Sequence, residues 1–170
     1  LFALHSLDHK TTESHAVSLQ GIDLQVAAGE IVGIAGVAGN GQDELLAALS
    51  GEILTEAGMI SFQGSDVSTL GPSPRRAMGI LSAPEERLGH AAAPDMSLVE
   101  NAMLTGAQRE NLDKGGILDW TAARSFAERI IEAFDVRTPG PNNAARSLSG
   151  GNLQKFVIGR EVLQRPELLV

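Results

Sequence analysis

The chain has no cysteine, so neither a disulfide framework nor a metal site built on thiolates is available to it. This composition suits a reducing cytosol, and the fold must be held together by packing alone. No apolar run approaches the roughly 20 residues that span a bilayer, and the first residues lack the basic-then-apolar layout of a signal peptide. Any role at a membrane is therefore expected to depend on a partner protein.

Basic residues are also few. Thirteen Lys and Arg residues stand against twenty-one Asp and Glu residues, giving a formal net charge of −8. Such a charge repels a polyanion and leaves no basic face for a phosphate backbone, so we expect no nucleic acid partner. With 170 residues, 43% of them hydrophobic, the chain is long enough for one soluble domain with a proper core.

The first part of the chain predicts short strands, turns and a glycine-rich loop. Apolar patterning predicts strands over residues 2–7, 18–26 and 58–64. The small, branched run Ile31–Ala35 predicts a strand that is buried on both faces. It leads into the glycine-rich loop and then into a short helix, which is expected to end at Gly51 because glycine suits the left-handed position after a helix.

From about residue 72 the pattern becomes helical. Ser97 and Glu100 have the spacing of a capping box, in which the serine hydroxyl and the glutamate carboxylate bind free amides at a helix start. An apolar stripe predicts a helix over 121–134, and a further helix is predicted over 152–164. Residues 167–170 predict the start of a buried strand, so we expect more sequence after Val170.

The segment Gly36–Asp43 follows the pattern of a phosphate-binding loop. Its glycines at 36, 39 and 41 allow the backbone to curl, so that successive amides and the next helix N-terminus face phosphate oxygens. Gln42, however, replaces the lysine of that pattern, and Asp43 replaces the hydroxyl residue that holds magnesium. Asp43 and Glu44 also oppose an incoming triphosphate. Taken alone, the glycines equally suit a tight turn between a strand and a helix.

A second anion-binding pattern lies at Leu148–Lys155. Ser149, Gly150 and Gly151 at a helix N-terminus would expose backbone amides and a hydroxyl to an anion, with the helix dipole behind them. The alternative is an ordinary serine-capped helix with glycines at its start. The position of this segment, well after a phosphate-type loop and separated from it by helices, favours the anion cradle.

This combination resembles the ATP-binding-cassette (ABC) ATPase family over essentially the whole chain. Leu148–Gln154 looks like the family's signature motif in its LSGGN form, and Gly29–Gly41 looks like the entry into the Walker A loop. Pro84–Arg87 resembles a segment of second-half importer cassettes in which Glu85 takes the place of the Q-loop glutamine. Ser97–Asn101 resembles the family's Ser-Val-x-Glu-Asn helix start. Phe134–Arg137, with the loop after it, is most similar to the nucleoside and simple-sugar importer branch.

The resemblance implies an α/β fold: a P-loop NTPase cassette with a RecA-like core, an antiparallel β subdomain and a helical signature subdomain, truncated before Walker B. Residues 1–170 would be a partial nucleotide-binding domain. Within it, 1–83 would be the β and phosphate-loop part, 84–164 the helical subdomain, and 165–170 the start of the Walker B strand. The residues expected to contact nucleotide are Gly36, Gly39, Asn40, Gly41, Gln42, Asp43, Ser149, Gly150, Gly151 and Asn152.

Two departures from the family pattern limit what this chain can do. The adenine-stacking aromatic is expected near Glu13–His15, where only His15 could stack, and a solvated loop histidine is the alternative. The Walker B aspartate, the catalytic carboxylate and the switch histidine belong after Val170 in the family layout. No catalytic residue is therefore expected among these residues, and residues 1–170 alone are expected to hydrolyse no ATP.

By resemblance, ATP and Mg²⁺ are the cofactors, with Asp43 or Glu85 as possible magnesium ligands. Two cassettes close head to tail, so Ser149 and its neighbours would cap an ATP held by a first-half cassette of the same polypeptide. The other expected partners are transmembrane permease subunits and, indirectly, a solute-binding protein, which places the protein at the cytoplasmic face of the membrane. A non-transport ABC protein and a regulatory pseudo-cassette that hydrolyses nothing stay as alternatives.

Overall fold

The computed structural model describes residues 1–11 and 16–170 of the chain, and these form two compact units. The first unit holds Leu1–Ile80 and Val170, and the second holds Leu81–Leu169. Each unit is described separately below. In the described part of the chain, no helix has the length and apolar character needed to cross a membrane.

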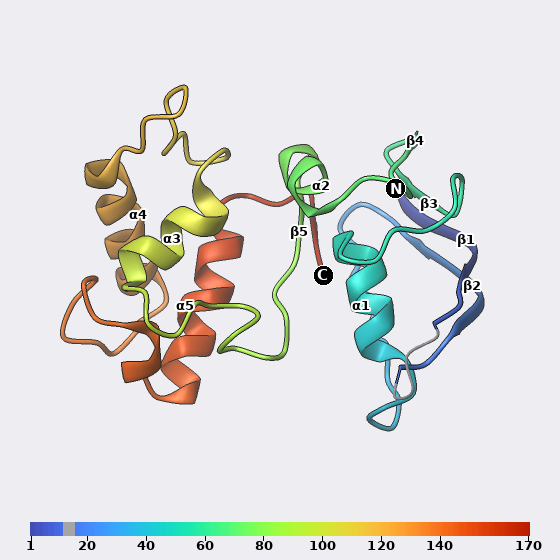
Figure 1. Cartoon of the computed structure of the whole chain (residues 1–170), viewed down its shortest axis with the longest axis horizontal. Coiled ribbons are helices and arrows are strands. Elements are labelled where there is room, and N and C mark those ends of the chain that lie inside the picture. Colours follow the sequence, from blue (N-terminus) through green and yellow to red (C-terminus); the bar gives the residue numbers. More distant parts are fainter. Residues whose placement is uncertain (12–15) are drawn as a thin grey trace. The chain divides into compact units, whose positions relative to one another are not determined.

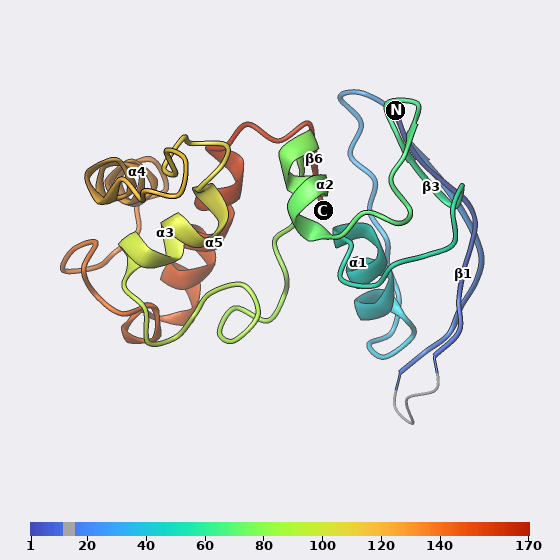
Figure 2. The ribbon, with the colours of Figure 1, turned by 45° about the horizontal axis from the view of Figure 1, so that its top comes forward.

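The first unit is an antiparallel sheet with two short helices. Its elements are β1 (Phe2–His9), β2 (Leu19–Val26), α1 (Gln42–Ser50), β3 (Ile60–Phe62), β4 (Ser65–Asp66) and α2 (Pro72–Met78). The four strands lie in the order β2-β1-β3-β4. Figures 1 and 2 show α1 on one side of this sheet. The strands expected over 2–7, 18–26 and 58–64 are confirmed.

A buried arginine holds the end of α1 in place. The Arg75 guanidinium donates to the carbonyls of Ala48 and Leu49 near the end of α1, and to those of Val67 and Ser68. Arg75 is fully buried, so these carbonyls are satisfied without water. Gly51 follows α1 with φ 87°, and a Cβ there would lie 2.8 Å from the Leu70 carbonyl oxygen. The predicted glycine end of this helix is confirmed.

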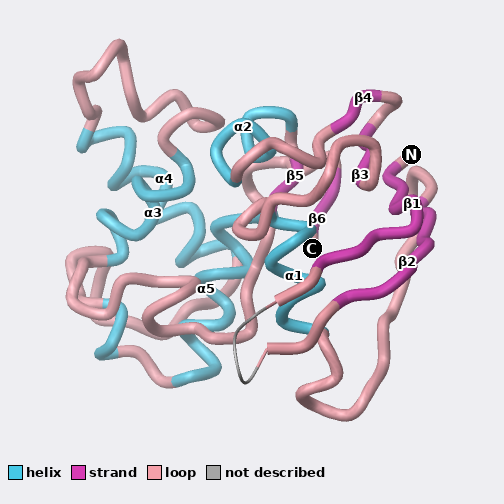
Figure 3. Tube along the Cα trace, turned by 45° about the vertical axis from the view of Figure 1, so that its right-hand side comes forward, coloured by secondary structure: helices cyan, strands magenta, loops and turns pink. Residues whose placement is uncertain are grey.

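The prediction of a buried strand over Ile31–Ala35 is wrong for this structure. Figure 3 draws the whole segment between β2 and α1 as loop, and Ile31 is 97% exposed. A strand buried on both faces needs neighbouring strands to accept and donate its ladder hydrogen bonds. Among the described strands, none pairs with residues 31–35. The apolar run is therefore an exposed loop.

The second unit is mainly helical. Its elements are α3 (Leu98–Gly106), α4 (Trp120–Ala133), the short 3₁₀ helix η1 (Ala145–Ser147) and α5 (Gly150–Val162), and β5 (Ile80–Leu81) pairs with β6 (Leu168–Leu169) in a two-stranded sheet. The helices predicted over 121–134 and 152–164 are confirmed as α4 and α5. A strand does form near the C-terminus, but Leu169 is 40% exposed, so the prediction that it is buried is wrong.

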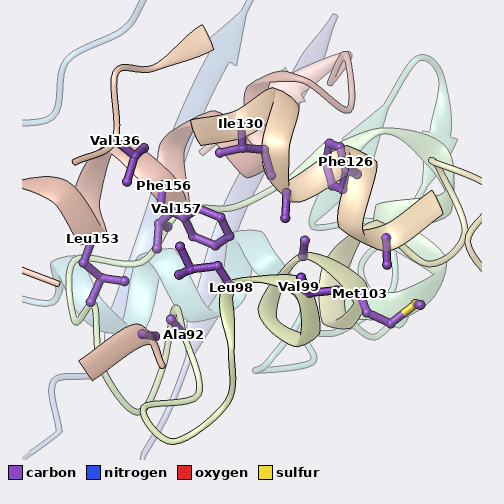
Figure 4. Packing of buried hydrophobic residues seen from close by; sticks show 14 of the residues in the cluster. Ala92, Leu98, Val99, Met103, Phe126, Ile130, Val136, Leu153, Phe156 and Val157 are labelled. Carbon is purple, nitrogen blue, oxygen red and sulfur yellow. The ribbon is translucent and has the colours of Figure 1, made fainter. Parts of the chain in front are cut away.

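The core of the second unit lies between α3, α4 and α5. Figure 4 shows Leu98, Ile130, Phe156 and Val157 pointing toward one another from these helices. All four side chains are buried. Because α5 contributes the last two, burying its apolar side chains fixes the position of its N-terminus, where the signature segment lies.

Hydrogen bonds from polar side chains join α5 to α3. Arg160, which is 2% exposed, donates to the carbonyls of Ala91 and Asn101 at 2.7 and 3.1 Å. It also pairs with the fully buried Glu161, whose carboxylate accepts from the Thr105 hydroxyl. These bonds join α5, α3 and the segment before α3 through groups that are buried or, at Thr105, partly buried.

The capping box predicted for α3 is present. The Ser97 hydroxyl accepts from the Glu100 N–H at 3.2 Å, and the Glu100 carboxylate accepts from the Ser97 hydroxyl and N–H, each at 2.7 Å. Both bonds to the carboxylate lower the pKa of Glu100, and the bond from the Ser97 hydroxyl lowers it more than the bond from the Ser97 N–H.

Changing Glu100 to Gln is expected to reduce stability in a pH-dependent way. The depressed pKa of Glu100 means that its carboxylate stabilises the folded state fully above the unfolded value of 4.5, and that this contribution is lost as pH falls through the folded pKa. The thermal midpoint of the unchanged full-length protein should therefore exceed that of Glu100→Gln at pH 7, and the gap should close toward pH 3. Glu128→Gln, on an exposed α4 position, is the control. A gap that is constant with pH would contradict this role.

Candidate nucleotide-binding segments

The phosphate-type loop runs from Gly36 to Gly41 and leads directly into α1. Gly39 and Gly41 have φ of 84° and 97°, in the left-handed region that glycine adopts without strain. Gly41 is the N-cap of α1 and offers no side chain to its first amides. Those amides have no partner within the helix, so they are oriented toward any anion placed at the loop.

The side chain of Gln42 forms two hydrogen bonds with the backbone of the phosphate-type loop. Its Nε2 donates to the Val37 carbonyl at 3.0 Å, and its Oε1 accepts from the Asn40 N–H at 3.0 Å. A Cβ on Gly36 would lie only 2.5 Å from Gln42 Nε2, so the glycine leaves room for this amide. A lysine could only donate, whereas the glutamine amide satisfies a loop carbonyl and a loop amide together. The Asn40 N–H is thereby already used.

The two carboxylates in the first turn of α1 differ in their surroundings. Glu44 Oε1 accepts from the Val17 N–H at 2.8 Å, so this carboxylate is bound to the segment before β2. Asp43 is exposed. Asp43 is therefore the carboxylate of this pair that is open to an incoming ligand.

His15 is the residue predicted to stack on an adenine ring near Glu13–His15. These positions lie outside the described residues.

The signature segment lies on the surface at the N-terminus of α5. Ser149 is the N-cap, Gly150 begins the helix, and Ser149, Gly150 and Gly151 are all exposed. The Ser149 side chain makes no capping bond to the helix backbone. A Cβ built on Gly151 meets no atom within 4 Å, so the space in front of this turn is open. The residue types are those of an anion cradle, and the geometry leaves it accessible.

Two residues that were not among the predicted nucleotide-binding residues contact this segment. Arg87 donates from Nη1 to the Gly150 carbonyl at 3.2 Å, which links the Pro84–Arg87 segment to the first turn of α5. The Arg137 N–H donates to Asn152 Oδ1 at 2.9 Å. The motif Pro84–Arg87 was recognisable, but nothing in its spacing placed Arg87 beside the signature. Glu85, the residue expected at the Q-loop position, is exposed.

The described residues contain no cluster of side chains that could hold a metal ion. Within 1–11 and 16–170, no group of three or more His, Cys, Asp or Glu side chains is placed to hold a metal ion. Asp43 and Glu85, the two candidates from the sequence, are exposed single carboxylates that belong to different units.

Solved ABC cassettes share this fold. The ATP-binding cassette MJ0796, in a dimeric post-hydrolysis state bound to ADP and Pi, matches with a TM-score of 0.77 at 17% identity, covering 99% of this chain and 72% of that one. A nucleotide-free ATP-binding cassette from an ABC transporter matches with a TM-score of 0.72 at 18% identity, covering 99% and 66%. The α/β cassette fold expected from the sequence is confirmed.

The chain belongs to the ABC transporter family, whose profile matches residues 19–170. It is 39% identical over 155 residues to the glucose import ATP-binding protein TsgD13 of Haloferax volcanii, covering 90% of this chain and 28% of that protein. It is likewise 39% identical over 153 residues to the guanosine import ATP-binding protein NupO of Bacillus subtilis, covering 90% and 30%. The chain thus spans about three tenths of the length of these curated relatives.

Proposed function

We propose that this chain is part of the ATP-binding subunit of an ABC importer, in which Ser149, Gly150 and Gly151 cap an ATP held mainly by another cassette. The observation that carries the proposal is the contrast between its two anion-binding segments. The first turn of α5 is open, whereas the phosphate-type loop already binds the amide of Gln42. The first-half cassette of the same polypeptide would supply the competent phosphate loop.

The open segment suits a terminal phosphate. Helix amides, the α5 dipole and the Ser149 hydroxyl are fixed before nucleotide arrives, and such preorganised donors stabilise charge that develops on a transferring phosphoryl group. The chain's own phosphate-type loop would bind nucleotide weakly or hold it without fast turnover. A phosphate that reaches the Asn40 N–H must displace Oε1 of Gln42, and one at the start of α1 must approach the exposed Asp43.

ATP and Mg²⁺ are the proposed cofactors. Magnesium is commonly held by one or two carboxylates together with substrate phosphates, and the exposed Asp43 at the start of α1 offers one such oxygen. Glu85 is the alternative proposed ligand, in place of Asp43. When bound, the ion would neutralise charge on the β- and γ-phosphates.

The proposed solute is a sugar or a nucleoside, since relatives named for glucose, guanosine and nucleoside import match this chain. The proposed partners are transmembrane permease subunits and, indirectly, a solute-binding protein. Closure of the two cassettes would move the permease subunits through contacts near Glu85–Gly89. The protein would then lie at the cytoplasmic face of the membrane through its permease. Nucleotide titration of the full-length protein, with and without a change at Ser149, separates this function from a regulatory pseudo-cassette, for which hydrolysis would not depend on Ser149.

Gln42→Lys alone is expected to restore no tight ATP binding to the phosphate-type loop of the full-length protein. The lysine supplies a cation, but Asp43 stays at the position of the magnesium-binding hydroxyl, and residues 13–15 contain no Phe, Tyr or Trp. The double change Gln42→Lys, Asp43→Thr should bind ATP more tightly than either single change. The measurement is equilibrium ATP binding to each variant. Tight binding by Gln42→Lys alone would show that the carboxylate matters little.

A further inference from the structure

The serine at the start of α5 behaves unlike an ordinary N-cap. An N-cap serine oxygen normally accepts from the N–H of the second or third helical residue, and Ser149 does not. Its Oγ instead accepts from Nδ2 of Asn152 at 2.9 Å. The first-turn amides of α5 therefore donate no hydrogen bond to Ser149, whose oxygen accepts from Asn152 instead.

The second bond of Asn152 fixes which way its amide faces. The Arg137 N–H can only donate, so the atom that meets it at 2.9 Å must be the side-chain oxygen Oδ1. The NH₂ group therefore faces Ser149. Since NH₂ can only donate, the serine oxygen must accept, and the hydroxyl proton is left to point away from Asn152.

These bonds form one directed series. The Arg137 N–H donates to Asn152, Asn152 donates to Ser149, and the Ser149 hydroxyl has its proton available for a ligand on the exposed side. Hydrogen bonds in series polarise one another, which makes the last donor stronger.

We propose that Asn152 is a positioning residue for the signature segment: it holds the Ser149 hydroxyl as a donor to a terminal phosphate and keeps that serine from capping the first-turn amides of α5. This inference rests on the proposed function and adds to it a division of roles. Ser149 touches the phosphate, and Asn152 acts through Ser149.

The segment that carries Arg137 has a second attachment, which provides a control. Lys155 Nζ donates to the Asp135 carbonyl at 2.9 Å and to its carboxylate at 3.1 Å. Lys155→Met would loosen the same segment from α5 without removing either bond of Asn152. Any effect of a looser segment should therefore appear in Lys155→Met as well.

The test is a double-mutant cycle on ATP hydrolysis by the full-length protein in its transporter complex, with variants Asn152→Ala, Ser149→Ala and the pair. Ser149→Ala should lower kcat by about 10²-fold or more. Asn152→Ala should lower kcat by about tenfold with KM little changed, and should cause no further loss when Ser149 is already alanine. Lys155→Met should stay near the unchanged protein.

A further variant tests the direction of the bond. Asn152→Asp keeps the acceptor for Arg137 but presents a carboxylate oxygen to Ser149, so the hydroxyl proton would turn inward and kcat should fall further than in Asn152→Ala. The positioning role would be overturned if the losses in kcat were additive in the cycle, or if Asn152→Ala left kcat unchanged. It would also be overturned if kcat fell no further in Asn152→Asp than in Asn152→Ala, or if Lys155→Met lowered kcat as much as Asn152→Ala. An active Ser149→Ala would instead overturn the proposed function itself.

Discussion

Ser149→Arg or Gly151→Asp should lower ATP hydrolysis and solute uptake by the full-length transporter by at least about 10²–10³-fold, the usual cost of losing one preorganised donor to a developing oxyanion. Arginine places bulk where the hydroxyl lies, and aspartate places negative charge beside the terminal phosphate. A Cβ built on Gly151 meets no atom within 4 Å, so the loss should come from the added charge at the site and not from a clash of the Cβ with the fold.

The comparison set lies in the phosphate-type loop. Gly39→Ala and Gln42→Ala alter a segment that already lacks its lysine, so transport should fall far less. Gly140→Asp is the matched control for charge, because a Cβ on Gly140 also meets no atom within 4 Å. Both activities are measured at saturating ATP. Equal losses from the two sets would mean that both segments serve a working site, and a greater loss from the loop set would mean that the phosphate-type loop serves the working site.

Arg160→Met is expected to lower the free energy of unfolding of the helical unit by about 3–5 kcal/mol, the range found when one partner of a buried ion pair is removed. The change removes the guanidinium that pairs with the fully buried Glu161 and that donates to the carbonyls of Ala91 and Asn101. Because these bonds join α5 to α3, the signature segment should lose its fixed position together with the stability.

The measurement is the unfolding midpoint of the full-length protein, together with hydrogen-exchange protection of α5. Arg165→Met, at an exposed position after the same helix, should leave both close to the unchanged protein. Adding Glu161→Gln to Arg160→Met should recover part of the loss, because the buried carboxylate that lost its ion pair with Arg160 is then neutral. An Arg160→Met protein as stable as the control would show that the packing of Phe156 and Val157 is sufficient.

Local signals in the sequence were enough to place most elements. The capping box at Ser97, the glycine end of α1 and the apolar stripe of α4 each depend on residues close together in the chain, and all three are present. The strand predicted over Ile31–Ala35 depends on neighbours elsewhere in the chain, and no described strand pairs with it. An apolar pattern indicates that a segment can form a buried strand, but it does not indicate whether a neighbouring strand is present to pair with it.

In the candidate site, too, features set by residues close together in the chain were predictable, and contacts between distant segments were not. The glycines and the serine of both anion-binding segments were identified from spacing, as was the replacement of lysine by Gln42. The bonds of Gln42 within its own loop, and the series from Arg137 through Asn152 to Ser149, could not be predicted. They depend on side-chain rotamers and on a contact between the segment after α4 and the start of α5, neither of which is encoded in a short motif.

Photolabelling the full-length protein with an ATP analogue that carries a reactive group on its γ-phosphate tests the central claim most directly. The account predicts label on the peptide containing Ser149–Asn152. That label should disappear when the phosphate-loop lysine of the first-half cassette is replaced, and it should persist in Gln42→Ala. The contradicting result is label on residues 36–43 that is lost in Gln42→Ala and unchanged when the first-half lysine is replaced. It would show that the signature segment of this chain does not contact an ATP bound by another cassette.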